Sequence, residues 1–134
     1  MGLSRAAMFR IGAALSVSAG VMLTVAPPTA AADGAAAGQR LYQTRCGGCH
    51  SVDSNRIGPR HRNVVGRAVA SVPGYNYSAA LRNLGGVWTP ARLDQWLRGT
   101  QKMAPGSRMY LEMNDAAQRR LIVAYLQSVS NPQR

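Results

Sequence analysis

Apolar residues in this chain recur at helical spacing, but only over short segments separated by long irregular ones. Asp33 is suited to cap a first helix over residues 34–45, in which Leu41 and Tyr42 fall at helical spacing. Residues 51–77 then contain many Gly, Pro, Asn and Ser residues without periodicity, which indicates a long loop. In a domain this small, a loop of that length either surrounds a ligand or lacks order.

Three further helices are predicted after this loop. A short helix over residues 78–84 ends at two glycines, and the next begins at Thr89 and Pro90 and stops near Gly99. Asn114 and Asp115 begin the last helix. The apolar stripes of the last two helices consist of Leu93, Trp96 and Leu97 and of Leu121, Ile122, Tyr125, Leu126 and Val129. Because no segment alternates at period two, the expected class is all-α, with three or four short helices.

The first 32 residues differ in composition from the rest and are typical of an export signal. Arg5 and Arg10 give a positive start, residues 11–26 carry no charge, and an Ala-x-Ala cleavage pattern ends at Ala32. The alternative is a retained membrane anchor, but the apolar segment is shorter than the roughly 18 residues of a spanning helix. We therefore expect cleavage near Ala32, with residues 33–134 forming a single periplasmic domain without stable membrane insertion.

The charge of this domain restricts its partners. Without Arg5 and Arg10, 14 of the 16 basic side chains remain against five acidic ones, a net charge of +9. Such a field speeds encounter with acidic proteins. Nucleic acid is excluded as a partner because the arginines are scattered and lack the interleaved aromatic residues of a stacking platform. Helices this short bury little apolar surface alone, so we expect a bound group to complete the core.

The two cysteines of the chain stand three residues apart and precede a histidine, in the segment Cys46-Gly47-Gly48-Cys49-His50. A disulfide at this spacing would constrain little of the unfolded chain. A thioredoxin-type pair requires a βαβ context, and a zinc site would take four ligands, with His61 as the remaining candidate. The pattern Cys-x-x-Cys-His is instead the attachment sequence of haem c. It predicts thioether bonds from Cys46 and Cys49 to one haem, with His50 as an iron ligand.

The residue on the other side of the iron separates an electron carrier from a catalyst. An open position binds small molecules, whereas a methionine sulfur saturates the iron and raises its potential. The domain offers Met103, Met109 and Met113. Met109 follows the segment APGSR, whose proline and glycine favour an extended chain that can cross the far face of the ring. We therefore predict Met109 as the second ligand.

Six segments together resemble the class I cytochromes c of the mitochondrial and related bacterial type. They are CGGCH, GPRHRNVVGR, VPGYNYSAAL, VWTPARLDQWL, APGSRM and LIVAYLQ, which occur in the family's order over residues 38–129. The resemblance implies the cytochrome c fold, in which the first and last helices cross where Gly38 approaches the region of Ala124 and Tyr125. It also implies His50 and Met109 as the axial ligands of the haem iron.

The resemblance implies roles for four further residues. The carbonyl of Pro59 would accept the proton of the ligand histidine and thereby fix its tautomer. Arg67, Tyr77 and Trp88 would hold the buried haem propionates.

Four positions depart from the common pattern of the family. Trp96 stands where many members have a tyrosine near the methionine sulfur, and Leu81 where many have an asparagine. His61 occupies a position that is usually apolar, and we expect it to be packed or partly exposed rather than an iron ligand. Gln101 replaces a lysine of the docking face. The resemblance therefore fixes neither the hydrogen bonds near the distal ligand nor the exact potential, and the partner need not be the usual oxidase.

The resemblance implies a monomeric one-electron carrier between respiratory redox complexes, and no enzymatic activity. An exposed haem edge would orient an acidic oxidase, reductase or dehydrogenase through basic residues drawn from Arg45, Arg60, Arg82, Lys102 and Arg108. Two alternatives remain open: an electron-accepting subunit of a periplasmic dehydrogenase, and a pentacoordinate haem that reacts with a gas or a peroxide.

Overall fold

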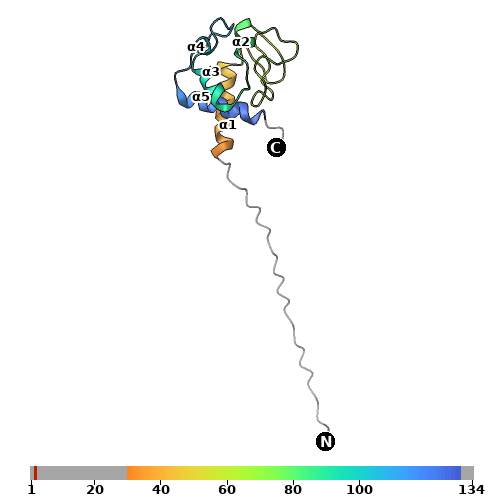
Figure 1. The fold of residues 1–134 in the computed structure, drawn as a ribbon. Coiled ribbons are helices and arrows are strands. Elements are labelled where there is room, and N and C mark those ends of the chain that lie inside the picture. The colour runs from red at the N-terminus through yellow and green to blue at the C-terminus, as the bar shows by residue number, and fades with distance from the viewer. Residues whose placement is uncertain (1, 3–29, 131–134) are drawn as a thin grey trace.

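The computed structural model describes residue 2 and residues 30–130 of the 134-residue chain. In this part there are five helices and no strand: α1 (Ala30–Arg45), α2 (Ala79–Leu84), α3 (Pro90–Arg98), α4 (Thr100–Met103) and α5 (Ala116–Ser128). One isolated antiparallel bridge joins Ala68 to Val87. In Figure 1 the long loop before α2 lies on one side of the helices and α4 lies on the other. The expected all-α class is confirmed.

Helices α1 and α5 cross in close contact, as Figure 1 shows. Gly38 is buried at the crossing, and a Cβ atom added to it would lie 2.0 Å from the Leu121 carbonyl oxygen. Beside it, the rings of Tyr42 and Tyr125 lie 5.1 Å apart between centroids. The crossing implied at Gly38 is confirmed, and Leu121 and Tyr125 are the residues of α5 that approach Gly38 most closely.

The predicted capping residues begin the later helices. Thr89 accepts a hydrogen bond from the Arg92 amide at 3.1 Å, and Asp115 accepts one from the Ala117 amide at 2.8 Å. At the first helix the prediction was wrong. Because α1 already begins at Ala30, Asp33 lies within its first turn. A carboxylate there still stabilises the helix through the positive end of its dipole.

Helix α4 was not predicted as a separate element. Its four residues follow Gly99 directly, and so short a segment shows no periodicity by which to recognise it. This single turn is connected to the segment before α5, because the Thr100 amide donates to the Leu111 carbonyl at 3.0 Å.

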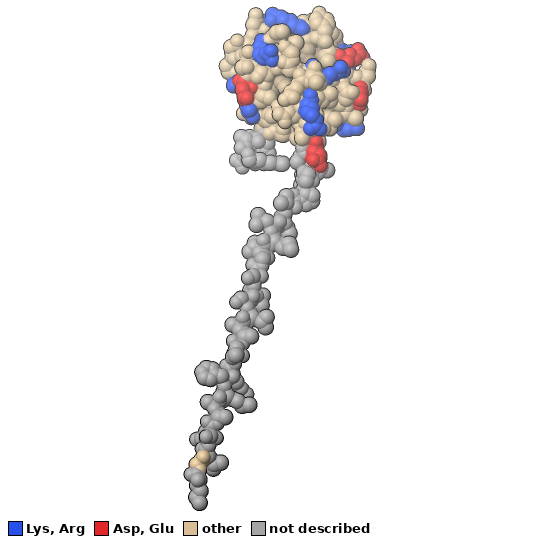
Figure 2. Space-filling model, turned by 180° about the vertical axis from the view of Figure 1, so that it is seen from behind, with Lys and Arg blue, Asp and Glu red and all other residues tan. Residues whose placement is uncertain are grey.

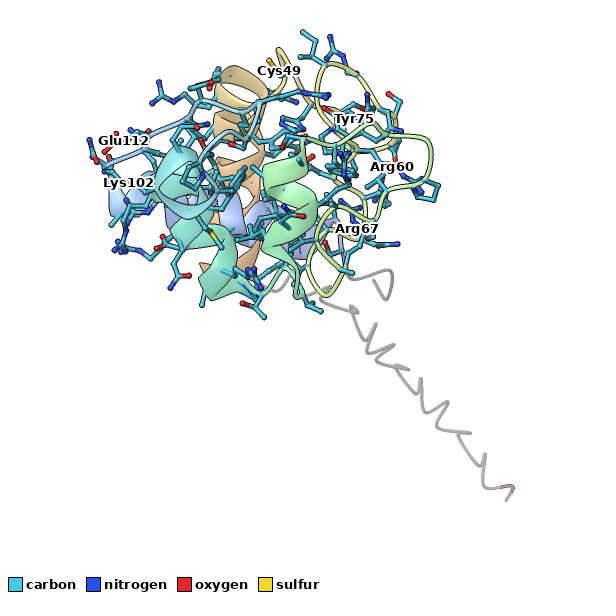
Figure 3. The ribbon with its side chains drawn as sticks, turned by 45° about the horizontal axis from the view of Figure 1, so that its top comes forward. Cys49, Arg60, Arg67, Tyr75, Lys102 and Glu112 are labelled. Carbon is cyan, nitrogen blue, oxygen red and sulfur yellow. The ribbon has the colours of Figure 1, made fainter. Side chains whose placement is uncertain are left out.

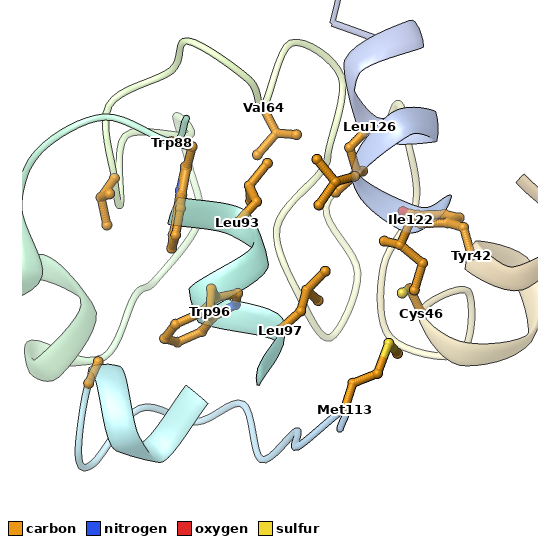
Figure 4. Packing of buried hydrophobic residues seen from close by; sticks show 13 residues of the cluster. Tyr42, Cys46, Val64, Trp88, Leu93, Trp96, Leu97, Met113, Ile122 and Leu126 are labelled. Atoms are coloured by element: carbon orange, nitrogen blue, oxygen red, sulfur yellow. The ribbon is translucent and has the colours of Figure 1, made fainter. Parts of the chain in front are cut away.

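Buried apolar residues from α3, α5 and the end of α1 form the core, which Figure 4 shows from close by. The predicted residues Leu93, Trp96, Leu97, Ile122 and Leu126 are all buried. The last stripe was partly wrong: Val123 is buried, whereas Leu121, Tyr125 and Val129 are only half-buried.

A buried charge joins two of the core helices. The Arg119 guanidinium is 5% exposed and donates to the Asp94 carboxylate of α3 at 2.7 Å. It also donates to the carbonyls of Met113 and Asn114 at 2.7 and 2.9 Å. The neighbouring guanidinium holds the pKa of Asp94 below its ordinary value, so the carboxylate is ionised at neutral pH. The pair therefore connects α3 to α5 and to the segment before α5.

The expected signal peptide, residues 1–32, lies outside the described residues apart from residue 2 and the start of α1. Its removal stays a prediction. None of the helices in residues 30–130 is long and apolar enough to cross a membrane.

Candidate haem-binding site

A cavity of about 370 Å³ lies between α3, α5 and the long loop. Every residue predicted to take part in haem binding lines this cavity: Cys46, Cys49, His50, Pro59, Arg67, Tyr77, Trp88 and Met109. Figure 3 shows Cys49 beyond the end of α1, with Tyr75, Arg60 and Arg67 along the loop beside it. Residues that are far apart in the sequence thus surround one space.

The cysteine segment continues α1 as a helical turn. The Cys46 amide donates to the Tyr42 carbonyl at 2.8 Å, and the His50 amide donates to the Cys46 carbonyl at 2.8 Å. This turn directs both cysteines and His50 to the cavity. Both thiols are free, with Cys46 buried and Cys49 exposed, so the alternative of a disulfide is not found. Burial raises the pKa of the Cys46 thiol to about 11, and it is therefore neutral at neutral pH.

The alternative of a zinc site also lacks a ligand set. Within residues 30–130, no three side chains of His, Cys, Asp or Glu come together in a group that could hold a metal ion.

The ring of His50 is fixed by its neighbours in the long loop. Its Nδ1 lies 2.8 Å from the Pro59 carbonyl oxygen, so the Nδ1 proton is donated there and the lone pair of Nε2 is free to bind a metal. Burial lowers the pKa of His50, which favours this neutral form. Gly58 is required beside the ring, because a Cβ atom there would lie 2.2 Å from Cε1 of His50.

His61 lies next to His50, as part of a polar pair that the sequence did not predict. The two imidazole rings stack with centroids 4.1 Å apart and planes inclined by 20°. The Tyr42 hydroxyl and Nδ1 of His61 are 3.0 Å apart, within hydrogen-bond distance. His61 is half-buried, and burial followed by the nearby His50 and Arg67 holds its pKa well below the ordinary value. The expectation that His61 is packed or partly exposed is confirmed, and its ring is neutral at neutral pH.

Of the three methionines in residues 33–130, Met109 alone lines the cavity. Met113 is 2% exposed within the core, and Met103 is half-buried against it. Trp96 and Leu81, two of the positions that depart from the family pattern, line the same cavity.

Three side chains with hydrogen-bond donors border the cavity beside the loop. The Arg67 guanidinium donates to the Arg60 and Arg62 carbonyls at 3.0 and 2.9 Å, and burial lowers its pKa. The hydroxyl of the buried Tyr77 accepts from the Val72 amide at 3.3 Å, so its own proton is available to an acceptor in the cavity. Trp88 is 7% exposed, with the Arg92 guanidinium 5.9 Å from its ring centroid.

The rim of the cavity carries apolar and basic side chains. Ile57 and Tyr110 are 76% and 80% exposed and also line the cavity, as do Arg45 and Arg108. The other basic residues of the predicted ring do not line the cavity. Lys102 forms an ion pair with Glu112, and the two side chains lie away from Arg60 and Arg67 in Figure 3. On the face shown in Figure 2, basic side chains are scattered among uncharged ones.

These residues fit a covalently attached haem. The cavity is mainly apolar, two free thiols and an imidazole of fixed tautomer lie together at its edge, and a thioether reaches it from another segment. When bound, a haem supplies a metal that accepts and releases one electron. The chain supplies two cysteines that fit the attachment motif and mainly apolar surroundings, and His50 and Met109 are the side chains that would bind the metal.

Comparisons with known proteins identify the family. The model of the cytochrome c family matches residues 35–130. Cytochrome cy of Rhodobacter capsulatus is 39% identical over 107 residues, which are 78% of this chain and only 53% of that relative. Cytochrome c2 of Rhodopila globiformis is 40% identical over 95 residues, which cover 69% of this chain and 90% of the relative. The solved structure of cytochrome cH from Methylobacterium extorquens has a TM-score of 0.67 and 35% identity, covering 70% of this chain and 97% of that one.

This chain therefore belongs to the cytochrome c family, within the class I monohaem cytochromes. Members of the family carry covalently bound haem c and transfer electrons rather than catalyse reactions. Cys46 and Cys49 fit the attachment motif of the family.

Proposed function

We propose that this protein is a one-electron carrier whose haem iron is ligated by His50 and Met109. The observation that carries this proposal is that Met109 lines the cavity with His50, whereas Met103 and Met113 pack outside it. With both axial positions filled, the iron can change oxidation state without exchanging ligands. A pentacoordinate haem that reacts with a gas or a peroxide would need an open position, so the placement of Met109 disfavours that alternative.

The same proposal assigns the haem propionates to Arg67, Tyr77 and Trp88. Each of these side chains carries a donor and borders the cavity. A charged guanidinium and two neutral donors can compensate the cost of burying carboxylates in a mainly apolar space.

The partner is proposed to be an acidic redox protein that docks at the rim of the cavity. Ile57 and Tyr110 offer exposed apolar contacts, and Arg45 and Arg108 line the same cavity. Contact between apolar side chains excludes water, while the net positive charge speeds the encounter. Such a surface suits an oxidase, a reductase or a dehydrogenase equally. A dehydrogenase of which this chain is a fixed subunit would co-purify with it at constant ratio.

The decisive experiment is the near-infrared spectrum of the ferric haem-bound protein and of Met109→Ala. The weak band of sulfur-to-iron ligation should be present in the wild type and absent in the variant. Met103→Ala is the matched control, because Met103 is half-buried outside the cavity, and it should keep the band. An identical band in the Met109→Ala variant would show that another residue is the ligand.

Export to the periplasm is the remaining part of the proposal, supported by the composition of residues 1–32. Sequencing the amino terminus of the haem-bound protein from a periplasmic extract should give a start near Asp33. A start at Met1, with the protein in the membrane fraction, would instead indicate a retained anchor.

A further inference from the structure

Three side chains donate hydrogen bonds to the backbone carbonyl of Met109. The Thr100 hydroxyl lies 2.6 Å from this oxygen, the Gln101 amide nitrogen 2.8 Å and the Ser107 hydroxyl 3.1 Å. We call Thr100, Gln101 and Ser107 the Met109 bracket. Because a carbonyl has two lone pairs, three donors share its capacity.

Gln101 is the central member of the Met109 bracket, because it makes three contacts with residues 106 and 107 and a fourth with Met109 itself. Its amide nitrogen lies 2.9 Å from both the carbonyl oxygen and the hydroxyl of Ser107, besides its contact with Met109. Its amide oxygen accepts from the Gly106 amide at 3.1 Å. The donor and acceptor ends of one side chain thus match a segment in which Gly106 has a φ of 86°. A glutamine amide supplies both a donor and an acceptor at this position.

The Met109 bracket is largely shielded from solvent. Thr100 and Ser107 are 0% and 2% exposed, and Gln101 is half-buried. Thr100 also accepts from the Leu111 amide at 3.1 Å, so α4 holds the chain on both sides of Met109. This gives a reason for the separate turn α4: its first two residues face the segment that carries the proposed ligand.

We propose that Gln101, together with Thr100, is a positioning residue that keeps the Met109 segment closed over the haem and thereby resists entry of other ligands. The inference rests on the proposed ligation by Met109. For an external ligand such as imidazole to bind the iron, the bond from the iron to the Met109 sulfur breaks, a bond from the iron to the imidazole nitrogen forms, and no electron is transferred. The segment must move away, which breaks the hydrogen bonds of Gln101. The apparent affinity of the external ligand for the iron is therefore its intrinsic affinity multiplied by the small fraction of molecules in which the Met109 segment is open.

Gln101→Glu is the sharpest test, because it keeps the shape and the acceptor for Gly106 but replaces the donor by an oxygen. Gln101→Leu removes both ends without adding charge. In the ferric haem-bound protein, imidazole is titrated while the near-infrared sulfur band is followed. Loss of about one net hydrogen bond corresponds to about a tenfold change in an equilibrium, so both variants should bind imidazole about tenfold more tightly. Gln127→Glu, an equal change of charge on the exposed side of α5, should leave the affinity unchanged.

The buried member of the Met109 bracket offers an independent test. Thr100→Val removes the hydroxyl at nearly constant volume and should also raise the affinity for imidazole, whereas Thr100→Ser retains the hydroxyl and should restore the wild-type value. A role in packing alone would give the opposite order, because Thr100→Ser loses a buried methyl group and Thr100→Val does not. The same measurements can be made as carbon monoxide binding to the ferrous protein, should a ferric variant be unstable.

The outcomes separate this inference from the proposed function. If the wild type lacks the sulfur band, or Met109→Ala keeps it, both proposals fail. If Met109 is the ligand but the Gln101 variants bind imidazole within twofold of the wild type, only the positioning role is overturned.

Discussion

Replacing Gly38 by alanine tests the crossing of α1 and α5. The added Cβ would lie 2.0 Å from the Leu121 carbonyl oxygen and 2.9 Å from the Cβ atom of Tyr125. The first of these is a backbone atom of α5, so it moves only if the helices separate. Overpacking costs about 1–3 kcal/mol, and so short an approach places this site near the upper end. Alanine returns about 1 kcal/mol of helix propensity, which leaves a net loss of about 1–2 kcal/mol.

The measurement is unfolding of the haem-bound protein by guanidinium chloride, followed by far-ultraviolet circular dichroism. Gly34→Ala is the matched control, because Gly34 lies in the same helix and a Cβ atom there meets nothing within 4 Å. This control should be as stable as the wild type, or more stable by up to about 1 kcal/mol. The reasoning is refuted if Gly38→Ala is at least as stable as Gly34→Ala.

Three further predictions concern charge and the proximal ligand. Asp94→Asn should lower the free energy of unfolding by about 1–2 kcal/mol at neutral pH, since it removes a charged acceptor from Arg119. Because the folded pKa of Asp94 is lowered, this difference should stay complete above about pH 4, where the unfolded carboxyl titrates, and should disappear as pH falls through the folded pKa. A difference that persists in strong acid, measured by urea unfolding, would contradict this. Gly58→Ala should displace the ring of His50 and change the visible spectrum of the haem-bound protein, whereas Gly48→Ala, where a Cβ meets nothing within 4 Å, should not. Oxidation of the ferrous protein by anionic ferricyanide should slow as salt is added, because the field of the basic domain is screened. A rate that rises with salt would count against that field.

The sequence predicts the later helices well because their ends carry local signals. Thr89 and Asp115 each bond to amides of the turn that follows, and such a cap can be recognised without knowledge of the fold. The start of α1 was not predicted, because the helix begins at Ala30, before Asp33, and the alanines there form no apolar stripe that would indicate a helix. The buried position of Arg119 was also beyond prediction. Only the fold brings Asp94 and two carbonyls within its reach.

Within the site, the predicted residues are those whose chemistry fixes their sequence spacing. Thioether attachment requires two thiols and a histidine in one turn, so Cys46 and Cys49 could be assigned from the motif alone. Residues that act through contacts across the loops left no such pattern. Gly58 carries only the weak signal of a glycine before proline. At Gln101 the sequence shows only that a lysine of the family's docking face is replaced, and it gives no sign of the contacts with Met109.

The two proposed iron ligands are held in different ways, and the difference follows from their side chains. An imidazole has a second nitrogen, so His50 is positioned through its own ring by the Pro59 carbonyl. A thioether has no proton to give and is a weak acceptor, and its side chain has three rotatable bonds. Hydrogen bonding can therefore fix Met109 only through its backbone, where Thr100 and Gln101 donate. It follows that changes at Thr100 or Gln101 should weaken the distal ligand without disturbing the proximal one, and changes at Gly58 should do the reverse.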